Sequence, residues 1–245
     1  MPTPRAVVLE AFAQLRCSAI LRTQDKDAVA PSLDAAVRGG FRIIEVTMNT
    51  PGCLKQIKRL RRDPNLILGA GTVLTVEDAK LAMAAGAQFL VSPVTDPQII
   101  TFCRQHDLVS VPGTYTPTEM MNAHRAGADV VKLFPGPASG PTYVRAVRGP
   151  MPFLRLYPTH GVDEQNCTEW LDAGAFGVGF VASLFDPEDL AARRFDAIEA
   201  RAKRLVDAVS SHGKDAPDAD QADRNRIDGN GPSDGTAKPL RVFGG

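Results

Sequence analysis

The sequence predicts an α/β protein of the (βα)8 class, the TIM barrel, with an extra N-terminal helix and a disordered C-terminal tail. The main observation is a repeat in which a helical segment ends at a glycine and a short apolar strand follows at once. Glycine suits this position because it readily adopts the left-handed conformation that ends many helices. The length of 245 residues also agrees with this class, since α/β barrels of about 200 to 250 residues form one domain. The repeat marks Gly40, Gly86, Gly127 and Gly174.

These four glycines are separated by 46, 41 and 47 residues, about twice the length of a minimal βα unit. Each interval therefore predicts one further strand, and a short apolar run that follows a polar or proline-containing turn is present in each. One more apolar run precedes the first glycine. The eight expected strands are residues 18–21, 41–46, 66–70, 88–91, 108–112, 129–133, 153–157 and 176–181.

A doubly wound open sheet is the competing fold, because it shares the alternation of strand and helix. Eight units, without a Gly-x-Gly-x-x-Gly motif at the start of the first helix, favour closure into a barrel. Residues 1–16 are expected to form the extra helix, and the last helix is expected from about residue 187 to residue 209.

The domain is therefore predicted to span residues 1–209 and the disordered tail residues 210–245. From Ser211 onward only four residues are Leu, Ile, Val or Phe, whereas fifteen are Gly, Pro or Asp. So little apolar surface does not offset the entropy of ordering a chain.

Composition narrows the class of partner. The 28 basic and 28 acidic residues balance, which favours neither a nucleic acid nor a membrane surface and leaves small molecules or proteins. The four cysteines are far apart and form no Cys-x-x-Cys pair, and residues 1–14 lack the apolar stretch of a signal peptide. We therefore expect a protein of the reduced cytoplasm; the absence of a metal or another cofactor is implied only by the family resemblance given below.

Lys132 is the residue that points most directly to chemistry, because it interrupts the apolar, β-branched run of residues 129–135. A strand buried on both faces is a poor place for an ammonium ion. Alternation along the strand puts Val130, Lys132 and Phe134 on one face, and Ile43, Glu45 and Thr47 share a face of the second strand in the same way. Functional groups in such barrels lie at the carboxyl ends of the strands. The residues expected there are Arg22, Glu45, Thr47, Asn49, Thr72, Pro93, Lys132, Phe134 and Thr159.

Two structural explanations compete with a catalytic one: an ion pair between Lys132 and Glu45, or a lysine that extends out of the barrel mouth. The catalytic hypothesis is that desolvation lowers the pKa of the Lys132 amine and makes it a nucleophile. Glu45 then supplies the carboxylate that imine chemistry needs for proton transfer at the adjacent carbon.

Five motifs, in order and spacing, resemble the bacterial 2-keto-3-deoxy-6-phosphogluconate (KDPG) aldolase family over residues 5–208. The resemblance implies a trimeric (βα)8 barrel, a class I aldolase without metal, Lys132 as the imine-forming lysine and Glu45 as the general acid/base. The implied substrate is a 2-keto-3-deoxy (6-phospho)sugar acid, cleaved to pyruvate and an aldehyde such as glyceraldehyde 3-phosphate. The motifs are Glu45-Val46-Thr47, Gly69-Ala70-Gly71-Thr72-Val73-Leu74, Ser92-Pro93, Val111-Pro112-Gly113 and Lys132-Leu133-Phe134-Pro135.

The resemblance also suggests substrate contacts. Arg22 and Thr72 are candidates for the pyruvate carboxylate, with a rim salt bridge and a helix N-cap as the alternative roles. Phe134 and Pro93 would form an apolar wall, or serve only for packing. Residues 47–51, Thr-Met-Asn-Thr-Pro, are closer to the 2-keto-3-deoxy-6-phosphogalactonate (KDPGal) branch, so the C4 stereochemistry stays open.

The phosphate site departs most from the family pattern. The family presents glycines after the seventh strand and Gly-Gly-Ser or Gly-Ser after the eighth, where backbone N–H groups can bind phosphate. This chain has His160 and Val181-Ala182 in place of glycines, and keeps Gly161 and Ser183. His160 could bind a phosphate, fill the site and favour an unphosphorylated acid, or be a loop residue that faces solvent.

Two other functions remain as alternatives. An epimerase or isomerase would use Glu45 and Lys132 as an acid/base pair without an imine. A non-catalytic sugar-acid binding protein would keep the barrel and lose turnover.

Overall fold

The strands form parallel sheets in the computed structural model, which describes residues 4–212. Every strand pair is parallel, and a strand lies at each of the eight predicted positions. The fifth position holds two short strands that are separated by Pro112. The strands are β1 (Cys17–Leu21), β2 (Ile43–Thr47), β3 (Ile67–Gly71), β4 (Phe89–Val91), β5 (Val109–Val111), β6 (Gly113–Thr114), β7 (Val131–Leu133), β8 (Leu156–Pro158) and β9 (Val178–Phe180).

The strand order gives a curled sheet and excludes the doubly wound alternative. Six strands follow the order β5-β4-β3-β2-β1-β9, and three follow the order β6-β7-β8. A doubly wound sheet reverses its strand order at a switch point, whereas here neighbours in the sequence are neighbours in the sheets. The first strand also pairs with the last.

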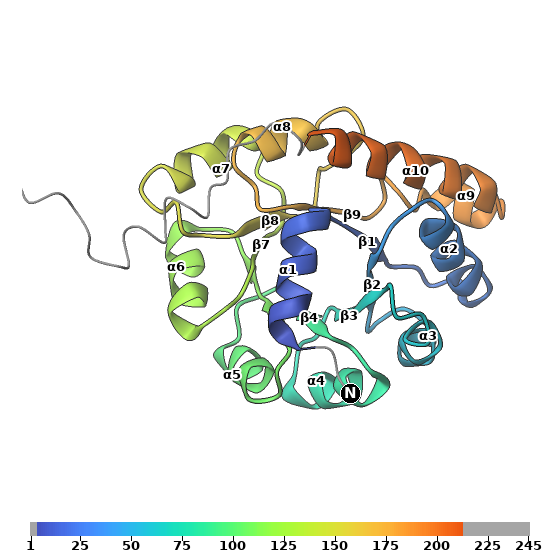
Figure 1. Ribbon diagram of the computed structural model, residues 1–245, viewed down its shortest axis with the longest axis horizontal. Coiled ribbons are helices and arrows are strands. Elements are labelled where there is room, and N and C mark those ends of the chain that lie inside the picture. Colours follow the sequence, from blue (N-terminus) through green and yellow to red (C-terminus); the bar gives the residue numbers. More distant parts are fainter. Residues whose placement is uncertain (1–3, 213–245) are drawn as a thin grey trace, which may run out of the picture. The chain divides into compact units, whose positions relative to one another are not determined.

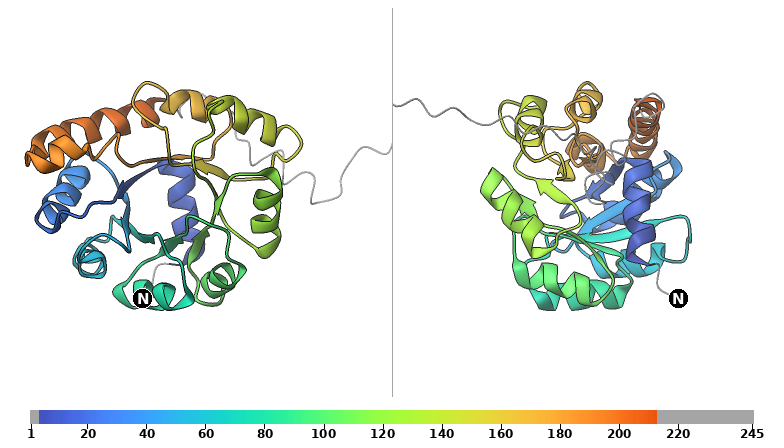
Figure 2. Two further views of the ribbon diagram at one scale, coloured as in Figure 1. Left: turned by 180° about the vertical axis from the view of Figure 1, so that it is seen from behind. Right: turned by 60° about the vertical axis from the view of Figure 1, so that its left-hand side comes forward.

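Helices alternate with the strands and surround them in a ring, while α1 lies across the middle at one end of the strands (Figure 1; Figure 2, right). Several helices begin at side-chain caps, such as Thr75, Thr116 and Asp25, as expected when a strand is followed directly by a helix. The helices are α1 (Arg5–Leu15), α2 (Lys26–Arg38), α3 (Cys53–Leu60), α4 (Val76–Ala85), α5 (Pro97–Gln105), α6 (Pro117–Ala126), α7 (Pro141–Arg148), α8 (Cys167–Asp172), α9 (Pro187–Ala191) and α10 (Phe195–His212).

The two faces of the strands pack into two separate hydrophobic cores. The outer core joins the strands to the surrounding helices and contains Ile44, Val131 and Leu133. The inner core is enclosed by the strands and contains Ile43 and Val130. Alternation along each strand therefore assigns every other residue to the inside, as the sequence predicts.

The prediction of one long C-terminal helix from residue 187 is wrong, because the chain breaks between α9 and α10. Arg193 adopts a left-handed conformation with φ of 57°. Its guanidinium pairs with Asp25 at 2.5 Å, and Arg194 pairs with the buried Asp189, also at 2.5 Å. No glycine or proline marks this break; of its two ion pairs, the one to Asp25 joins segments that are far apart in the sequence, and the one to Asp189 is local.

The predicted tail, residues 210–245, is tested only at its start. Residues 210–212 continue α10, and the others lie outside the described residues. In the described part of the chain, no helix is long and apolar enough to cross a membrane.

Candidate active site

Lys132 and Glu45 both project into the space that the strands enclose. Two positions before them lie Val130, which directly precedes β7, and Ile43 on β2, and both belong to the inner core. Because side chains alternate along a strand, Lys132 and Glu45 share the inner face. Their exposed fractions are 8% and 3%. Both groups are therefore buried, as the predicted placement inside one enclosure requires, and Lys132 does not extend into solvent.

Burial shifts the pKa of both groups toward their neutral forms. Desolvation lowers the pKa of Lys132, against the opposing effect of the Glu45 carboxylate; the nearby Arg22 lowers it further. Desolvation likewise raises the pKa of Glu45, against the attraction of Lys132 and Arg22. A neutral amine is the nucleophilic form of lysine. The environment of Lys132 therefore favours the form that can attack a carbonyl carbon.

The two groups interact through space and not as a direct ion pair. Among residues 4–212 no salt bridge within 4.0 Å joins Lys132 to Glu45, although each shifts the pKa of the other. This finding contradicts a structural ion pair. The Lys132 amine and the Glu45 carboxyl group therefore face a common space without a direct contact.

Gly71 makes room for the Glu45 carboxyl group, and sequence reasoning did not single it out as a site residue. A Cβ atom at position 71 would lie 1.9 Å from Glu45 Oε1. Gly71 pairs with Thr47, two residues after Glu45 on the neighbouring strand. A glycine at the carboxyl end of a strand, beside the strand of a candidate acid, is the signal that could have found it.

The ring of Phe134 lies next to the lysine amine, with 5.0 Å between Nζ and the ring centre. The strand that carries the lysine is fixed at this point, because Lys132 N donates to Pro112 O and Thr114 Oγ1 donates to Lys132 O, both at 2.9 Å. Lys132 pairs with Gly113 in the neighbouring strand. A Cβ at Gly113 would meet Pro93 O at 2.3 Å, so the segment of Pro93 closely approaches the strand beside the lysine.

Thr47 and Thr72 occupy the ends of β2 and β3. The Thr47 hydroxyl bonds to the Thr50 hydroxyl at 2.8 Å, and Thr50 Oγ1 also accepts from Thr23 N. Thr47 therefore organises the loops after β1 and β2. Thr72 has a left-handed φ of 55°, which is strained for a β-branched residue.

The alternative role of Thr72 as a helix cap is wrong, because Thr75 caps α4. A strained residue beside the site, with no capping duty, is consistent with a ligand-binding role.

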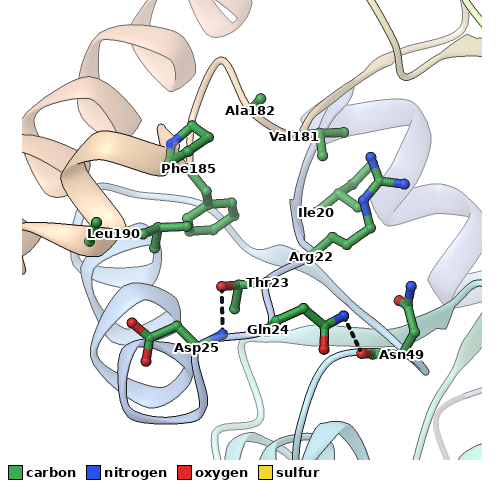
Figure 3. Close-up of a pocket in the computed structure, with 12 residues that line it drawn as sticks. Ile20, Arg22, Thr23, Gln24, Asp25, Asn49, Val181, Ala182, Phe185 and Leu190 are labelled. Carbon is green, nitrogen blue, oxygen red and sulfur yellow. Dashed lines mark hydrogen bonds between the residues drawn. The ribbon is translucent and has the colours of Figure 1, made fainter.

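Arg22 and Asn49 line a pocket of about 490 Å³ at the ends of β1, β2 and β9. In Figure 3 their side chains extend to the same side, and Gln24 Nε2 donates to Asn49 O. Arg22 is exposed and has no carboxylate partner among the described residues, so the rim salt bridge predicted as its alternative role is absent there. Its guanidinium is free to bind an anion. The apolar residues that line the pocket include Val181, Ala182, Phe185 and Leu190, and Val181 lies beside Arg22 (Figure 3).

The loops after β8 and β9 hold the remaining predicted residues. Thr159 is buried, and its methyl group would lie 2.9 Å from a Cβ at Gly179, on the inside of β9. The Ser183 hydroxyl donates to Val162 O at 2.7 Å, which ties the two loops together. Gly161 is exposed and has φ of 76°, a conformation that glycine adopts without strain.

His160 is exposed and contacts Phe134 edge to face, with ring centres 6.2 Å apart. It therefore borders the same wall as the lysine. The fold thus brings Lys132, Glu45, Phe134 and His160 around one space, and Arg22 acts electrostatically on both catalytic candidates. The hydroxyl groups of Thr47 and Ser183 instead form hydrogen bonds that hold the loops together.

A desolvated lysine amine beside a buried carboxyl group, inside a curled parallel sheet, defines an α/β enzyme of the lysine-dependent aldolase class. A model of the KDPG and KHG aldolase family matches residues 8–201. The chain belongs to this family, which confirms the family prediction.

Individual relatives agree with this assignment. The chain is 36% identical over 166 residues to the 2-dehydro-3-deoxy-phosphogluconate aldolase of Treponema pallidum, covering 67% of this chain and 79% of that protein. It is 29% identical over 194 residues to the 2-dehydro-3-deoxy-6-phosphogalactonate aldolase of Escherichia coli, covering 78% and 95%.

Solved structures give the same result. A native KDPGal structure matches with a TM-score of 0.74 at 28% identity, covering 81% of this chain and 96% of that chain. A KDPG aldolase from Legionella pneumophila, with pyruvate captured as a covalent carbinolamine intermediate, matches with a TM-score of 0.73 at 25% identity, covering 83% and 98%.

Proposed function

We propose that the protein is a class I aldolase that cleaves a 2-keto-3-deoxy (6-phospho)sugar acid to pyruvate and an aldehyde such as glyceraldehyde 3-phosphate. The observation that carries the proposal is the desolvated Lys132 amine, which shares an enclosed space with Glu45 without a direct ion pair. The Legionella relative captures pyruvate as a covalent carbinolamine, which is the adduct that an amine forms with a ketone.

The residues support a complete reaction sequence. The neutral Lys132 amine adds to the C2 ketone, and the protonated Glu45 carboxyl group gives its proton to the departing hydroxyl, so that water leaves, a protonated imine forms and Glu45 becomes a carboxylate. The electron pair of the C3–C4 bond moves into this imine, while Glu45 accepts the C4 hydroxyl proton and the aldehyde leaves. The resulting pyruvate enamine takes a proton at C3, and water hydrolyses the imine to release pyruvate and regenerate the amine.

The other residues bind the substrate in this proposal. Arg22 and Thr72 hold the pyruvate carboxylate; the unpaired guanidinium of Arg22 and the strained backbone of Thr72 support these roles. Phe134 and Pro93 form the wall beside the imine. The distal part of the substrate lies toward the loops that carry Thr47, Asn49, Thr159, His160, Gly161 and Ser183.

We further propose that the two sheets close into one eight-stranded (βα)8 barrel. Support comes from backbone hydrogen bonds at both seams: Val130 N donates to Ser110 O at 3.2 Å, and Phe176 N donates to Leu156 O at 2.8 Å.

A homotrimer in the cytoplasm completes the proposal. The trimer follows from the family resemblance. All four cysteines are free and buried, which suits a reducing compartment.

Borohydride reduction in the presence of pyruvate tests the mechanism. We expect a stable secondary amine on Lys132, located by peptide mass spectrometry, in the wild type and none in Lys132→Met. Lys55→Met, at another lysine of the chain, is the matched control and should be labelled like the wild type.

Turnover separates the remaining alternatives. Isomerisation of the sugar acid without a trapped adduct and without release of pyruvate would contradict the imine mechanism and favour an acid/base isomerase. Trapping without condensation of pyruvate with any aldehyde would indicate a binding protein.

A further inference from the structure

The pocket of about 490 Å³ beside the candidate active site has one unpaired cation in its lining. Ile20, which lines the pocket, pairs with Glu45 on the neighbouring strand. Because Glu45 accepts the C4 hydroxyl proton in the proposed reaction, the carbons beyond C4 extend toward this pocket. Among its lining residues Arg22 alone is basic, and Asp25 forms an ion pair with Arg193 at 2.5 Å. The pocket therefore offers a single positive charge to a ligand.

The loops after β8 and β9, together with α9, carry negative charge and no lysine or arginine. Residues 159–166 and 181–192 contain five acidic residues. Two of the five form salt bridges with arginines between residues 194 and 204. The three that form no salt bridge within residues 4–212 are Asp163, Asp186 and Glu188. A phosphate group carries about 1.5 to 2 negative charges at pH 7, so these loops would repel it.

Three hydrogen-bond donors of the loop after β9 already have acceptors within the fold. Ser183 Oγ donates to Val162 O at 2.7 Å. Leu184 N and Phe185 N both donate to Val181 O, at 3.1 Å and 2.8 Å. Hydroxyl and backbone N–H groups of this kind are the donors that a phosphate needs where no cation is present. Binding a phosphate here would therefore break hydrogen bonds that hold the loop in shape.

The part of the pocket nearest α9 is apolar. In Figure 3 the side chains of Phe185 and Leu190 lie together on one side of the pocket, whereas Arg22 and Asn49 lie on the other. Ala182 also lines the pocket and is exposed. Moving a charged group out of water onto apolar side chains costs far more free energy than moving an uncharged one. This part of the pocket therefore favours an uncharged ligand group.

We propose that the substrate is a 2-keto-3-deoxy sugar acid whose only negative charge is its C1 carboxylate, and that its aldehyde-derived end is unphosphorylated and binds in this pocket. This inference rests on the proposed aldolase function and narrows its substrate. Cleavage then releases pyruvate and a neutral aldehyde such as glyceraldehyde. The one unpaired cation of the lining, Arg22, is matched by the one carboxylate of such a substrate.

Two aldehydes that differ only in the phosphate group test the proposal. Wild-type protein with saturating pyruvate is given either glyceraldehyde or glyceraldehyde 3-phosphate, and the rate of condensation is measured. We expect kcat/KM to be about tenfold higher or more with the neutral aldehyde. Added salt should raise the rate with the phosphorylated aldehyde, because it screens the repulsion, and should change the rate with glyceraldehyde less than about twofold. An equal or higher kcat/KM with glyceraldehyde 3-phosphate would overturn the proposal.

A matched pair of substitutions tests the placement of the distal end. Ala182→Lys adds a cation to the pocket lining, and Ala182→Met adds a side chain of similar length without charge. We expect kcat/KM with glyceraldehyde 3-phosphate to be about tenfold higher in Ala182→Lys than in Ala182→Met. With glyceraldehyde the two variants should agree within about threefold. Glu10→Lys, at an exposed position of α1, is the control for overall charge and should alter neither rate. Equal rates of both Ala182 variants with the phosphorylated aldehyde would contradict this placement.

Borohydride trapping of pyruvate keeps this inference separate from the proposed function. A wild type that traps pyruvate and prefers the phosphorylated aldehyde would keep the aldolase mechanism and reject the neutral substrate. A wild type that traps no pyruvate would reject the proposed function and this inference with it.

Discussion

The two ends of the same strands contrast sharply in how they are filled. At the amino ends, α1 covers the inner core with Val8 and Phe12. The ring of Phe12 meets Phe89 and Tyr157 edge to face at 5.1 Å and 5.6 Å between centres. Arg5 ties the helix to Asp129, which precedes β7, at 2.6 Å. This end therefore consists of apolar packing and a paired charge, both of which stabilise the fold.

At the carboxyl ends, the same inner face holds two buried ionisable groups that have no direct ion-pair partner within residues 4–212. Lys132 and Glu45 are desolvated in ways that disfavour their charged forms, and Thr72 is strained. Such features lower stability and are retained where they serve chemistry. Residues that stabilise the fold and residues that can react are therefore separated along the strand direction. Glu45 lies two residues after the core residue Ile43, and Lys132 lies two residues after the core residue Val130.

Phe12→Ala should produce the largest change in stability. It removes a buried ring from the closed end and leaves a cavity, for which we expect a loss of about 3–5 kcal/mol in the free energy of unfolding. Chemical denaturation measures it, with the exposed Val7→Ala on the same helix as control. Activity per folded molecule should be unchanged. A comparable loss of activity would show that the two ends are not independent.

Gly71→Ala should change activity and leave stability nearly intact. The new Cβ must displace the Glu45 carboxyl group, a flexible side-chain end and not backbone. We expect kcat to fall about 10- to 100-fold, in the range of a misplaced general acid/base, with a smaller effect on pyruvate trapping. Gly149→Ala, where a Cβ meets only ordinary contacts at 3.6 Å, is the control. Full activity in Gly71→Ala would contradict the assigned role of Glu45.

Lys132→Met should abolish trapping. Near pH 6 its free energy of unfolding should equal that of the wild type or exceed it by up to about 1 kcal/mol, because the substitution removes a desolvated amine. The lowered pKa of Lys132 means that the unfolded chain binds more protons than the folded one between that pKa and the usual value near 10.5. Wild-type stability therefore rises with pH through this window. The advantage of Lys132→Met should shrink toward about pH 10; denaturation at several pH values measures it, and a growing advantage would contradict the sign.

The smallest expected effects are shifts in the pH midpoint of pyruvate trapping, which follows the neutral fraction of Lys132. The Glu45 carboxylate raises the pKa of Lys132, so Glu45→Gln should move the midpoint to lower pH. Arg22 lowers that pKa, so Arg22→Met should move the midpoint to higher pH. Shifts in the same direction would show that the electrostatic arrangement is assigned incorrectly.

Much of this architecture could be predicted from local pattern. The glycines that end helices located the strand positions, because the left-handed conformation leaves a mark at one residue. Alternation placed Lys132 and Glu45 on the inner face, because the period of two is a property of any strand. Boundaries were less certain: the seventh strand was predicted at residues 153–157 but spans Leu156–Pro158, and Phe153 is exposed.

What only the tertiary structure decided concerns contacts between segments that are far apart in the sequence. Four contacts are of this kind. They are the packing of α1 on the inner core, the approach of Gly71 to Glu45, the ion pair of Arg193 with Asp25, and the hydrogen bond from Gly136 to His160. The sequence by itself determined the family, the repeating units and the identity of the reactive pair, since these follow from residue type and spacing. It could not determine whether that pair is bonded or held apart, because burial and distance in three dimensions set the pKa of each group.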